Sequence, residues 1–189
     1  MDIIEEKKNK SEKHLVEKVR EGNPQAFEQL FFEYFFDLCS YALQFTKSSE
    51  RAKDVVQEVF YKLWKRRRDW NVHTSLKAYL FRAVRNEALN FIDKRDHQEK
   101  LKKQLSLQEE KVAPSQSSQK SQSDEQLVKV IWSIVKEMPQ RRQSVFVLHR
   151  KHGLSYKEIA EVLDISRKTV ENHMGLALDD IRTSIDLEL

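Results

Sequence analysis

The side chains best suited to reading DNA lie close together in residues 166–176. In the major groove an asparagine amide pairs with adenine and a carboxylate accepts a hydrogen bond from cytosine, so Asn172 and Glu171 are candidate base-reading side chains. Arg167 and Lys168 precede them and suit phosphate oxygens. The full candidate set for DNA contact is Ser166, Arg167, Lys168, Thr169, Glu171, Asn172 and Leu176.

Two short helices joined by a sharp turn are predicted to position this set. Ser155 and Glu158 have the spacing of a capping box, which starts the first helix. The run Asp164-Ile165-Ser166 then interrupts the helical pattern with residues that favour caps and turns. One apolar stripe of the second helix should face the first helix, at Val170, Met174, Ala177 and Ile181. The polar side chains then point outward, as in a helix-turn-helix reader.

The other residue types capable of chemistry form no recognisable site. Cys39 lies among aromatic residues at helical spacing, which indicates a packed core thiol in a reducing compartment. His149 and His152 lack the further ligands that zinc needs, so we interpret them as surface and capping histidines. Asp54 and Glu58 lie four residues apart with no histidine nearby, which is typical of a solvated or protein-binding face. We expect no metal, no cofactor and no enzymatic activity.

Composition favours helices. Three Gly and three Pro in 189 residues, with 34% charged residues, predict an all-α chain and disfavour a β-rich or doubly wound fold. No signal peptide is visible, and no apolar run approaches the roughly 20 residues that span a bilayer. We therefore expect a soluble, cytoplasmic protein without membrane insertion.

Charge is divided unevenly along the chain. Residues 24–60 carry three basic against six acidic side chains, whereas residues 62–103 carry thirteen against five. The first segment should avoid nucleic acid and the second should seek it. Two different partners are therefore expected.

The N-terminal half has the pattern of successive amphipathic helices. Residues 1–10 are expected to be a charged tail, followed by a short helix over His14 to Arg20. Asn23-Pro24 and Ser48-Ser49 are helix starts. The buried stripe of the first of these two helices is predicted at Phe27, Leu30, Phe31, Tyr34, Phe35, Leu38, Ala42 and Phe45, and that of the second at Ala52, Val55, Val56, Val59, Phe60 and Leu63.

A basic helix follows the connection Trp70 to Thr74, with Thr74 or Ser75 as its cap. Basic side chains beside aromatic rings suit a nucleic-acid strand that is being opened, although Trp70 could equally be ordinary core. Residues 97–123 are rich in Ser, Gln and Lys and predict a flexible linker. Two small helical domains are expected on either side of it, over residues 11–96 and 124–185.

Several runs resemble a known family. Tyr156 to Ala160 and Lys168 to Met174 resemble both the DNA-binding module of quorum-sensing-type response regulators and the C-terminal domain of sigma factors. The run from Asp54 to Trp64 strongly resembles the most recognisable segment of sigma factors, and Pro139 to Phe146 again resembles their C-terminal domain. The chain is thus similar to the extracytoplasmic-function (ECF) group of bacterial sigma-70 factors, over roughly residues 11–96 and 124–185.

This resemblance implies roles for particular residues. The first domain, similar to sigma region 2, would bind the β′ clamp helices of core RNA polymerase through Asp54, Gln57, Glu58 and Tyr61. It would bind −10 DNA through Trp70, Asn71, His73, Arg82, Arg85 and Asn86. The second domain, similar to sigma region 4, would read −35 DNA with the set in residues 166–176 and meet the β flap. An anti-sigma factor is a further expected partner.

The sequence departs from the family at two places. The Arg-Gly common in the −10 loop is replaced by Asn71-Val72-His73, so no −10 preference can be carried over. Leu176 stands where the family often has a basic residue, which favours apolar contact with a thymine methyl group.

Two other functions were weighed against the sigma factor. A response-regulator-like transcription factor would need alternating strands and helices in residues 1–123, where helical periods run throughout. A helical adaptor that binds only protein would not need the basic segment or the capped reading helix. A gel shift with and without polymerase would separate the three.

Overall fold

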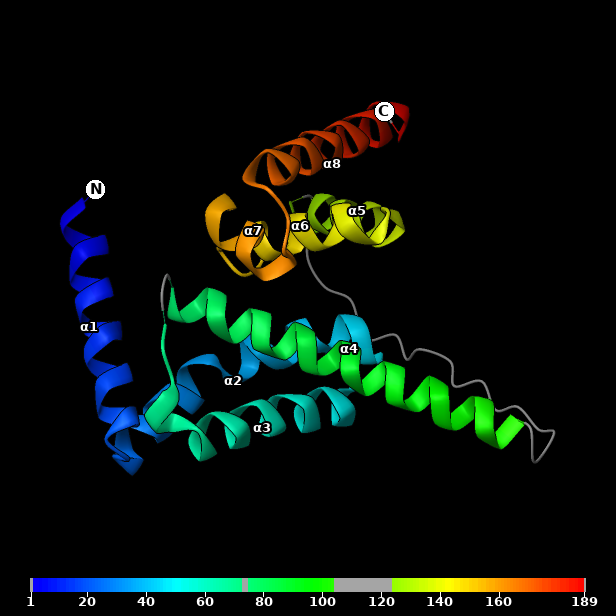
Figure 1. The fold of residues 1–189 in the computed structure, drawn as a ribbon. Coiled ribbons are helices and arrows are strands. Elements are labelled where there is room, and N and C mark those ends of the chain that lie inside the picture. Colours follow the sequence, from blue (N-terminus) through cyan, green and yellow to red (C-terminus); the bar gives the residue numbers. More distant parts are fainter. Residues whose placement is uncertain (1, 73–74, 104–123, 189) are drawn as a thin grey trace. The chain divides into compact units, whose positions relative to one another are not determined.

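The computed structural model of the chain describes the backbone of residues 2–72, 75–103 and 124–188, and the side chains of residues 11–72, 75–93 and 127–185. Every regular element in these ranges is a helix, which confirms the predicted all-α class. The chain divides near residue 101 into two compact units, called the N-terminal and the C-terminal domain below (Figure 1). In the described part of the chain, no helix is long and apolar enough to cross a membrane.

The N-terminal domain is built around an antiparallel pair of helices. The pair is α2 and α3, with α1 packed on α2 and on a short 3-10 helix, η1. The longest helix, α4, runs along the pair (Figure 1). The bounds are α1 Asp2–Arg20, α2 Pro24–Thr46, α3 Ser49–Lys65, η1 Arg67–Asp69 and α4 Leu76–Lys103.

The helix starts in this domain follow the predicted capping residues. The Asn23 side chain accepts a hydrogen bond of 2.9 Å from the backbone N–H three residues on, and Pro24 opens α2. The Ser48 and Ser75 hydroxyls accept equivalent bonds of 3.5 and 3.3 Å at the starts of α3 and α4. Gly22, with φ of +88°, makes the turn between α1 and α2. Local sequence therefore determines where these helices begin.

Two predicted boundaries are wrong in the same way. Residues 2–10 are the first half of α1 and not a tail, and α4 continues through residues 97–103, which were predicted to open the linker. Both stretches are rich in Lys, Glu and Gln, whose straight side chains favour helix even without an apolar stripe. The remainder of the predicted linker, residues 104–123, lies outside the described residues.

The core of the N-terminal domain lies between α2, α3 and α4. The predicted stripe of α3 is buried throughout, and so are Leu30, Tyr34, Leu38 and Ala42 of α2. Tyr41 and Phe81 are also fully buried, with ring centroids 5.1 Å apart, and they connect α2 to α4. Burial raises the pKa of Tyr41, and the Arg85 charge partly opposes that rise.

The C-terminal domain consists of α5 Asp124–Glu137, α6 Gln140–Arg150, α7 Tyr156–Leu163 and α8 Arg167–Glu188. Helix α8 packs across α6 and α5. An ion pair between Arg142 and Asp180 joins α6 to α8. The Gln143 amide donates a 3.1 Å hydrogen bond to the Val135 carbonyl, which satisfies the end of α5. Helices α5 and α6 thus hold α8 by its inner side.

Candidate protein and nucleic-acid interfaces

The turn between α7 and α8 has the predicted capping geometry. The Ser155 hydroxyl accepts a hydrogen bond from the Glu158 N–H at 3.3 Å, and the Glu158 carboxylate accepts from the Ser155 N–H at 2.8 Å. Asp164 ends α7 in the left-handed conformation, with φ of +55°. The Ser166 hydroxyl accepts from the Thr169 N–H at 3.0 Å and starts α8. The predicted helix-turn-helix is confirmed.

Helix α8 has one buried and one accessible side. Val170, Met174, Ala177 and Ile181 are buried, as predicted. On the other side Ser166, Arg167, Lys168, Asn172 and Leu176 are exposed, while Thr169 and Glu171 are half-buried. Gly175 shares the accessible side, and a Cβ atom built there would meet nothing within 4 Å. The whole predicted −35 set therefore lies on the open side of the first three turns.

Three charged side chains of this set interact with one another. The Arg167 Nε donates a 3.2 Å hydrogen bond to the Glu171 carboxylate, and the Lys168 Nζ lies 3.9 Å from its second oxygen. Arg167 and Lys168 are largely exposed, so each pair contributes only about 0.5 kcal/mol. In the free protein, Glu171 thus partly neutralises Arg167 and Lys168, the two cations best placed for phosphate. Because both pairs are weak, breaking them to bind phosphate costs little free energy.

The outer side of α3 presents the predicted protein-binding residues. Asp54, Gln57, Glu58 and Tyr61 are all exposed, opposite the buried stripe of this helix. Their spacing of three and four places them on one face. The Lys65 Nζ lies 5.8 Å from the centroid of the Tyr61 ring. The four side chains form one accessible patch of mixed polar and aromatic character.

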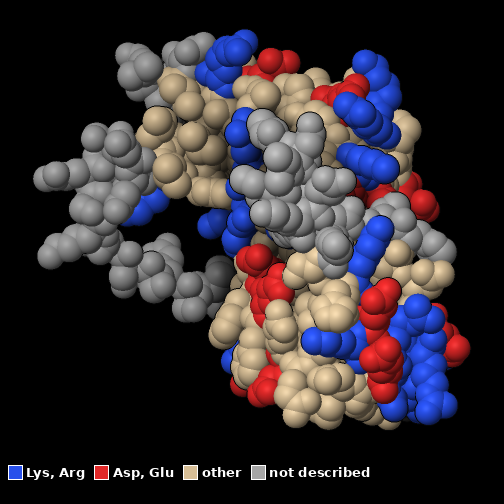
Figure 2. All heavy atoms as spheres, turned by 90° about the vertical axis from the view of Figure 1, so that its left-hand side faces the viewer, with Lys and Arg blue, Asp and Glu red and all other residues tan. Residues whose placement is uncertain are grey.

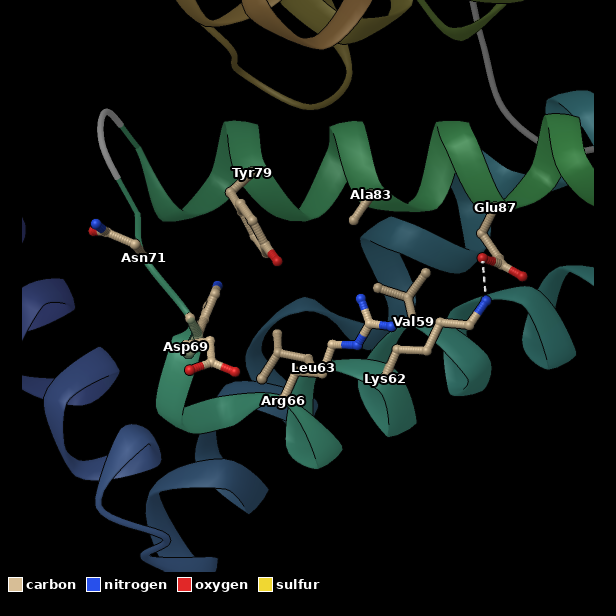
Figure 3. A pocket seen from close by; sticks show the side chains of 10 residues that line it. Val59, Lys62, Leu63, Arg66, Asp69, Asn71, Tyr79, Ala83 and Glu87 are labelled. Carbon is tan, nitrogen blue, oxygen red and sulfur yellow. Dashed lines mark hydrogen bonds and ion pairs between the residues drawn. The ribbon is translucent and has the colours of Figure 1, made fainter.

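A lysine next to this patch connects α3 to α4. The Lys62 Nζ lies 3.3 Å from a Glu58 carboxylate oxygen and 2.7 Å from one of Glu87, which is 25 residues away (Figure 3). The pKa of Lys62 is raised, chiefly by the hydrogen bond to Glu87. The Glu87 side chain is only 17% exposed. Lys62 is therefore a bridge between the face of α3 and the helix that carries the predicted −10 set.

Replacing Lys62 by glutamine should lower the free energy of unfolding by about 1 kcal/mol, the upper end for a partly exposed pair. The loss should shrink in high salt, because screening already weakens the pair in the parent protein. Urea denaturation at low and high salt would measure both effects. Lys53→Gln, an exposed α3 change, is the matched control. Equal stability of the two variants at low salt would contradict the bridge.

A pocket of about 610 Å³ opens between α3, η1 and the start of α4. Tyr79 and Glu87 point into it from α4, facing Lys62 of α3 and Arg66, the residue that follows α3 (Figure 3). Burial raises the pKa of Tyr79. Sequence reasoning missed this pocket, because its walls come from segments whose side chains are brought together only by packing.

The predicted −10 residues fall into three groups. Trp70 is only 4% exposed, and its ring lies 5.7 Å from that of Tyr79, so the core alternative for Trp70 is supported and its ring is not available to a base. Asn71, Arg82 and Asn86 are exposed, and Arg85 is half-buried on the same side of α4 as the last two. His73 and Thr74 lie outside the described residues.

The two histidines of α6 and the following turn are placed differently. The His149 Nδ1 donates to the Leu154 carbonyl at 2.9 Å, as a capping histidine should. His152 is 2% exposed, so its prediction as a surface residue is wrong. It lies between α6 and the capped start of α7, where the chain turns inward. Among the described residues no group of His, Cys, Asp and Glu is arranged to hold a metal ion.

The unequal charge of the chain is visible on its surface. On the face drawn in Figure 2, Lys and Arg side chains gather in groups beside groups of Asp and Glu, with uncharged surface between them. Local charge and not the net charge of +4 therefore decides what each surface attracts.

Comparisons with known proteins bear on both domains. Residues 30–98 match the family model of Sigma-70 region 2, and residues 129–181 match that of Sigma-70, region 4. The RNA polymerase sigma-H factor of Pseudomonas aeruginosa is 22% identical over 90% of this chain and 91% of its own. The ECF RNA polymerase sigma-E factor of Escherichia coli K12 is 23% identical over 90% and 92%.

Solved structures share the fold. CnrH, in complex with the cytosolic domain of CnrY, aligns with a TM-score of 0.63 and 22% identity, over 93% of this chain and 97% of CnrH. The sigma factor RpoE of Bartonella quintana, in complex with the anti-sigma factor NepR, aligns with a TM-score of 0.62 and 18% identity, over 86% and 98%.

Proposed function

Since the chain belongs to the sigma-70 family of RNA polymerase sigma factors, in its extracytoplasmic-function group, we propose how its surfaces divide the work of promoter recognition. The N-terminal domain binds core polymerase and −10 DNA, and the C-terminal domain binds −35 DNA. The two family regions are matched on two separate compact units, which supports this division.

The polymerase-binding surface in this proposal is the outer side of α3. Asp54, Gln57, Glu58 and Tyr61 are accessible together and offer hydrogen-bonding groups around one aromatic ring. Interfaces of this kind concentrate their binding free energy in a few such side chains. The partner is the β′ clamp helices, and the β flap is the proposed partner of the C-terminal domain.

The −10 surface consists of Asn71, Arg82, Arg85 and Asn86, with His73 as a further member outside the described residues. Arginine and asparagine side chains on one side of α4 suit a DNA backbone entering the melted region. Trp70 acts beneath this surface, packed on Tyr79, and positions the loop that carries Asn71.

The −35 surface is the accessible side of α8 from Ser166 to Leu176. Asn172 and Glu171 read base edges, Leu176 contacts a thymine methyl group, and Ser166, Arg167, Lys168 and Thr169 contact phosphates. The exposed N-terminal end of α8 adds its positive dipole to these contacts. The inner side of α8 is held by α5 and α6, so the reading side chains sit on a fixed frame.

Regulation by an anti-sigma factor is also proposed. CnrH was solved in complex with the cytosolic domain of CnrY, and the Bartonella RpoE in complex with the anti-sigma factor NepR, and this chain shares their fold. The site of action is the cytoplasm, where polymerase and chromosomal DNA are found.

The observation that carries the proposal is the open, capped reading helix in the domain that matches region 4. To test it, core polymerase with and without the chain would select from random promoter DNA, and the bound sites would be sequenced. Core polymerase plus the chain should enrich a paired −35 and −10 element and make −10 thymines reactive to permanganate. The chain alone should bind weakly and without sequence preference. Enrichment equal to that of core polymerase alone, or opening by the free chain, would contradict the proposal.

A further inference from the structure

Helix α2 exposes large apolar side chains on the side opposite to its core. Phe32 is 63% exposed, Phe36 77% and Leu43 42%. With Cys39 they occupy positions separated by four, three and four residues, which places all of them on one side of the helix. We call these four residues the α2 stripe. Large exposed apolar patches on soluble proteins mark sites of interaction.

The exposed rings are braced by a ladder of half-buried ones. Phe36 packs edge-on against Phe35 at 5.6 Å between centroids, and Phe35 stacks on Phe31 at 4.6 Å. Phe31 contacts both Phe32, at 5.7 Å, and Phe60 in the core of α3, at 4.9 Å. The stripe is thus connected to the core and loses little side-chain freedom when it is covered, which favours binding.

An open pocket of about 400 Å³ lies at the N-terminal end of the stripe. It is lined by Pro24, Gln25, Phe27, Glu28, Phe31 and Phe32. Its walls are largely apolar, so it can receive one large apolar side chain as an anchor. A binding partner would therefore place an aromatic or aliphatic residue at this end.

Acidic side chains flank the stripe on both sides. Glu28 lies along one edge and Glu33 along the other, and both are exposed. The sequence from residue 21 to residue 46 contains no Lys or Arg. A second copy of this surface, DNA and anionic lipid would all bring negative charge against these carboxylates. A partner with basic flanks is the one that the charges favour.

We propose that the α2 stripe is a docking surface for an amphipathic helix of a partner protein, with one large apolar anchor and Lys or Arg on both flanks. This is the helix-in-groove mode of recognition, in which anchors recur along one helical face. The proposal goes beyond the sigma-factor assignment, because none of the residues given a role in polymerase or DNA binding belongs to α2.

A display library of helical peptides, about 18 residues or five turns long, provides the probe. All peptides would have the same apolar residues along one helical face. The positions on either side of that face would be randomised among Lys, Arg, Glu, Gln and Ser. Selection would use the full chain as bait. Enriched peptides should have basic flanks, and their Kd should rise at least about tenfold on Phe32→Ser/Phe36→Ser. Glu28→Gln/Glu33→Gln should weaken them by about threefold at low salt, and less at high salt.

Leu178→Ser is the matched control, because Leu178 is an exposed apolar residue of α8. It should bind the enriched peptides as the parent does. Circular dichroism would confirm that the Phe variant keeps its helices, as the exposure of both rings predicts. Enrichment of acidic or neutral flanks, or equal peptide binding by the Phe variant, would overturn the proposal.

Cys39 offers a readout at the site itself, because it is the only cysteine of the chain. Burial raises the pKa of this thiol, and the Lys53 charge partly opposes that rise. Because the thiolate is the form that reacts, the alkylation rate is best followed at mildly alkaline pH. A bound peptide should slow alkylation severalfold. An unchanged rate at saturation would place the peptide elsewhere and refute the assignment.

Two further outcomes separate this proposal from others. The Phe variant should bind core polymerase with parental affinity. A loss of affinity as large as that of the α3 variants would make the α2 stripe part of the polymerase interface, and would overturn the proposal that it binds a different partner. Sedimentation should show the same mass for parent and Phe variant. A parental dimer that the substitution dissociates would identify a second copy as the occupant instead.

Discussion

Replacing Asp54, Gln57 and Glu58 together by alanine should weaken binding of the chain to core polymerase by about 2–4 kcal/mol, or about 30- to 700-fold in Kd. The three side chains lie on one accessible face of α3, and two of them, Asp54 and Glu58, are charged. Interface residues of this kind, once desolvated by a partner, dominate the binding free energy. Titration of labelled chain with core polymerase would measure the loss.

The same triple variant should remain folded. All three residues are exposed, so no cavity opens, and stability should change by only about 0.5 kcal/mol per site. Without Glu58 the Lys62 ammonium keeps its 2.7 Å bond to Glu87. Glu17→Ala/Glu21→Ala removes the same two negative charges from exposed positions outside α3 and is the matched control. A triple variant that keeps its helicity and binds polymerase as tightly as this control would disprove the α3 assignment.

Asn172→Ala should cost about 1–3 kcal/mol on the preferred −35 sequence and relax the preference at one base pair. The amide is exposed in the second turn of α8, and its loss disturbs no packing. Binding of the polymerase complex to a set of −35 sites with single base changes would show the effect. Thr183→Ala, an exposed change further along α8, is the control. If Asn172→Ala lowers binding affinity equally for preferred and scrambled −35 DNA, Asn172 does not read a base.

Arg167→Ala and Glu171→Gln should act in opposite directions on all sequences. The first removes a phosphate contact and should reduce the slope of log affinity against log salt by about one. The second frees Arg167 and Lys168 from the carboxylate that binds them in the free protein, so binding to any DNA should strengthen. If Glu171 also reads cytosine, selectivity at one position should fall at the same time. Weaker binding of Glu171→Gln to scrambled DNA would contradict this account.

Features that depend on near neighbours in sequence could be predicted. The starts of α2 and α7 rest on side chains that bond to N–H groups three residues away, and Asn23 and Ser155 show this. The inner side of α8 follows from helical spacing alone. For the same reason the accessible positions on its outer side could be predicted, while their role in reading DNA stays a prediction.

Features that depend on packing between distant segments could not. The bond between Lys62 and Glu87 spans 25 residues, and no local pattern announces it. Trp70 is buried with its ring 5.7 Å from that of Tyr79, and His152 is buried in the turn after α6; neither burial follows from a local sequence pattern. The ends of α1 and α4 were missed for a different reason. These highly charged segments are helical but lack the periodic apolar residues from which a helix is predicted.

The aromatic run of α2 contained a signal that was not used. Phe31-Phe32 and Phe35-Phe36 are neighbouring pairs, and neighbours on a helix point about 100° apart. The ring of each pair that lies two residues, or about 200° round the helix, from Leu30, Tyr34 or Leu38 points away from the core stripe, toward solvent or a partner. The structure identifies Phe32 and Phe36 as those rings.

The bridge at Lys62 connects the two surfaces proposed for the N-terminal domain, and it predicts that binding at one surface changes the free energy of binding at the other. One ammonium holds Glu58, on the proposed polymerase face, and Glu87, on the helix of the proposed −10 set. A polymerase cation that captures Glu58 leaves Lys62 to Glu87 alone, which changes the free energy of the α3–α4 contact. Such coupling is reciprocal, so DNA on α4 must alter polymerase affinity by the same factor. The coupling free energy cannot exceed the free energy of one partly exposed ion pair, about 1 kcal/mol, or about fivefold in affinity. A single side chain would then make polymerase and promoter DNA bind with mild cooperativity.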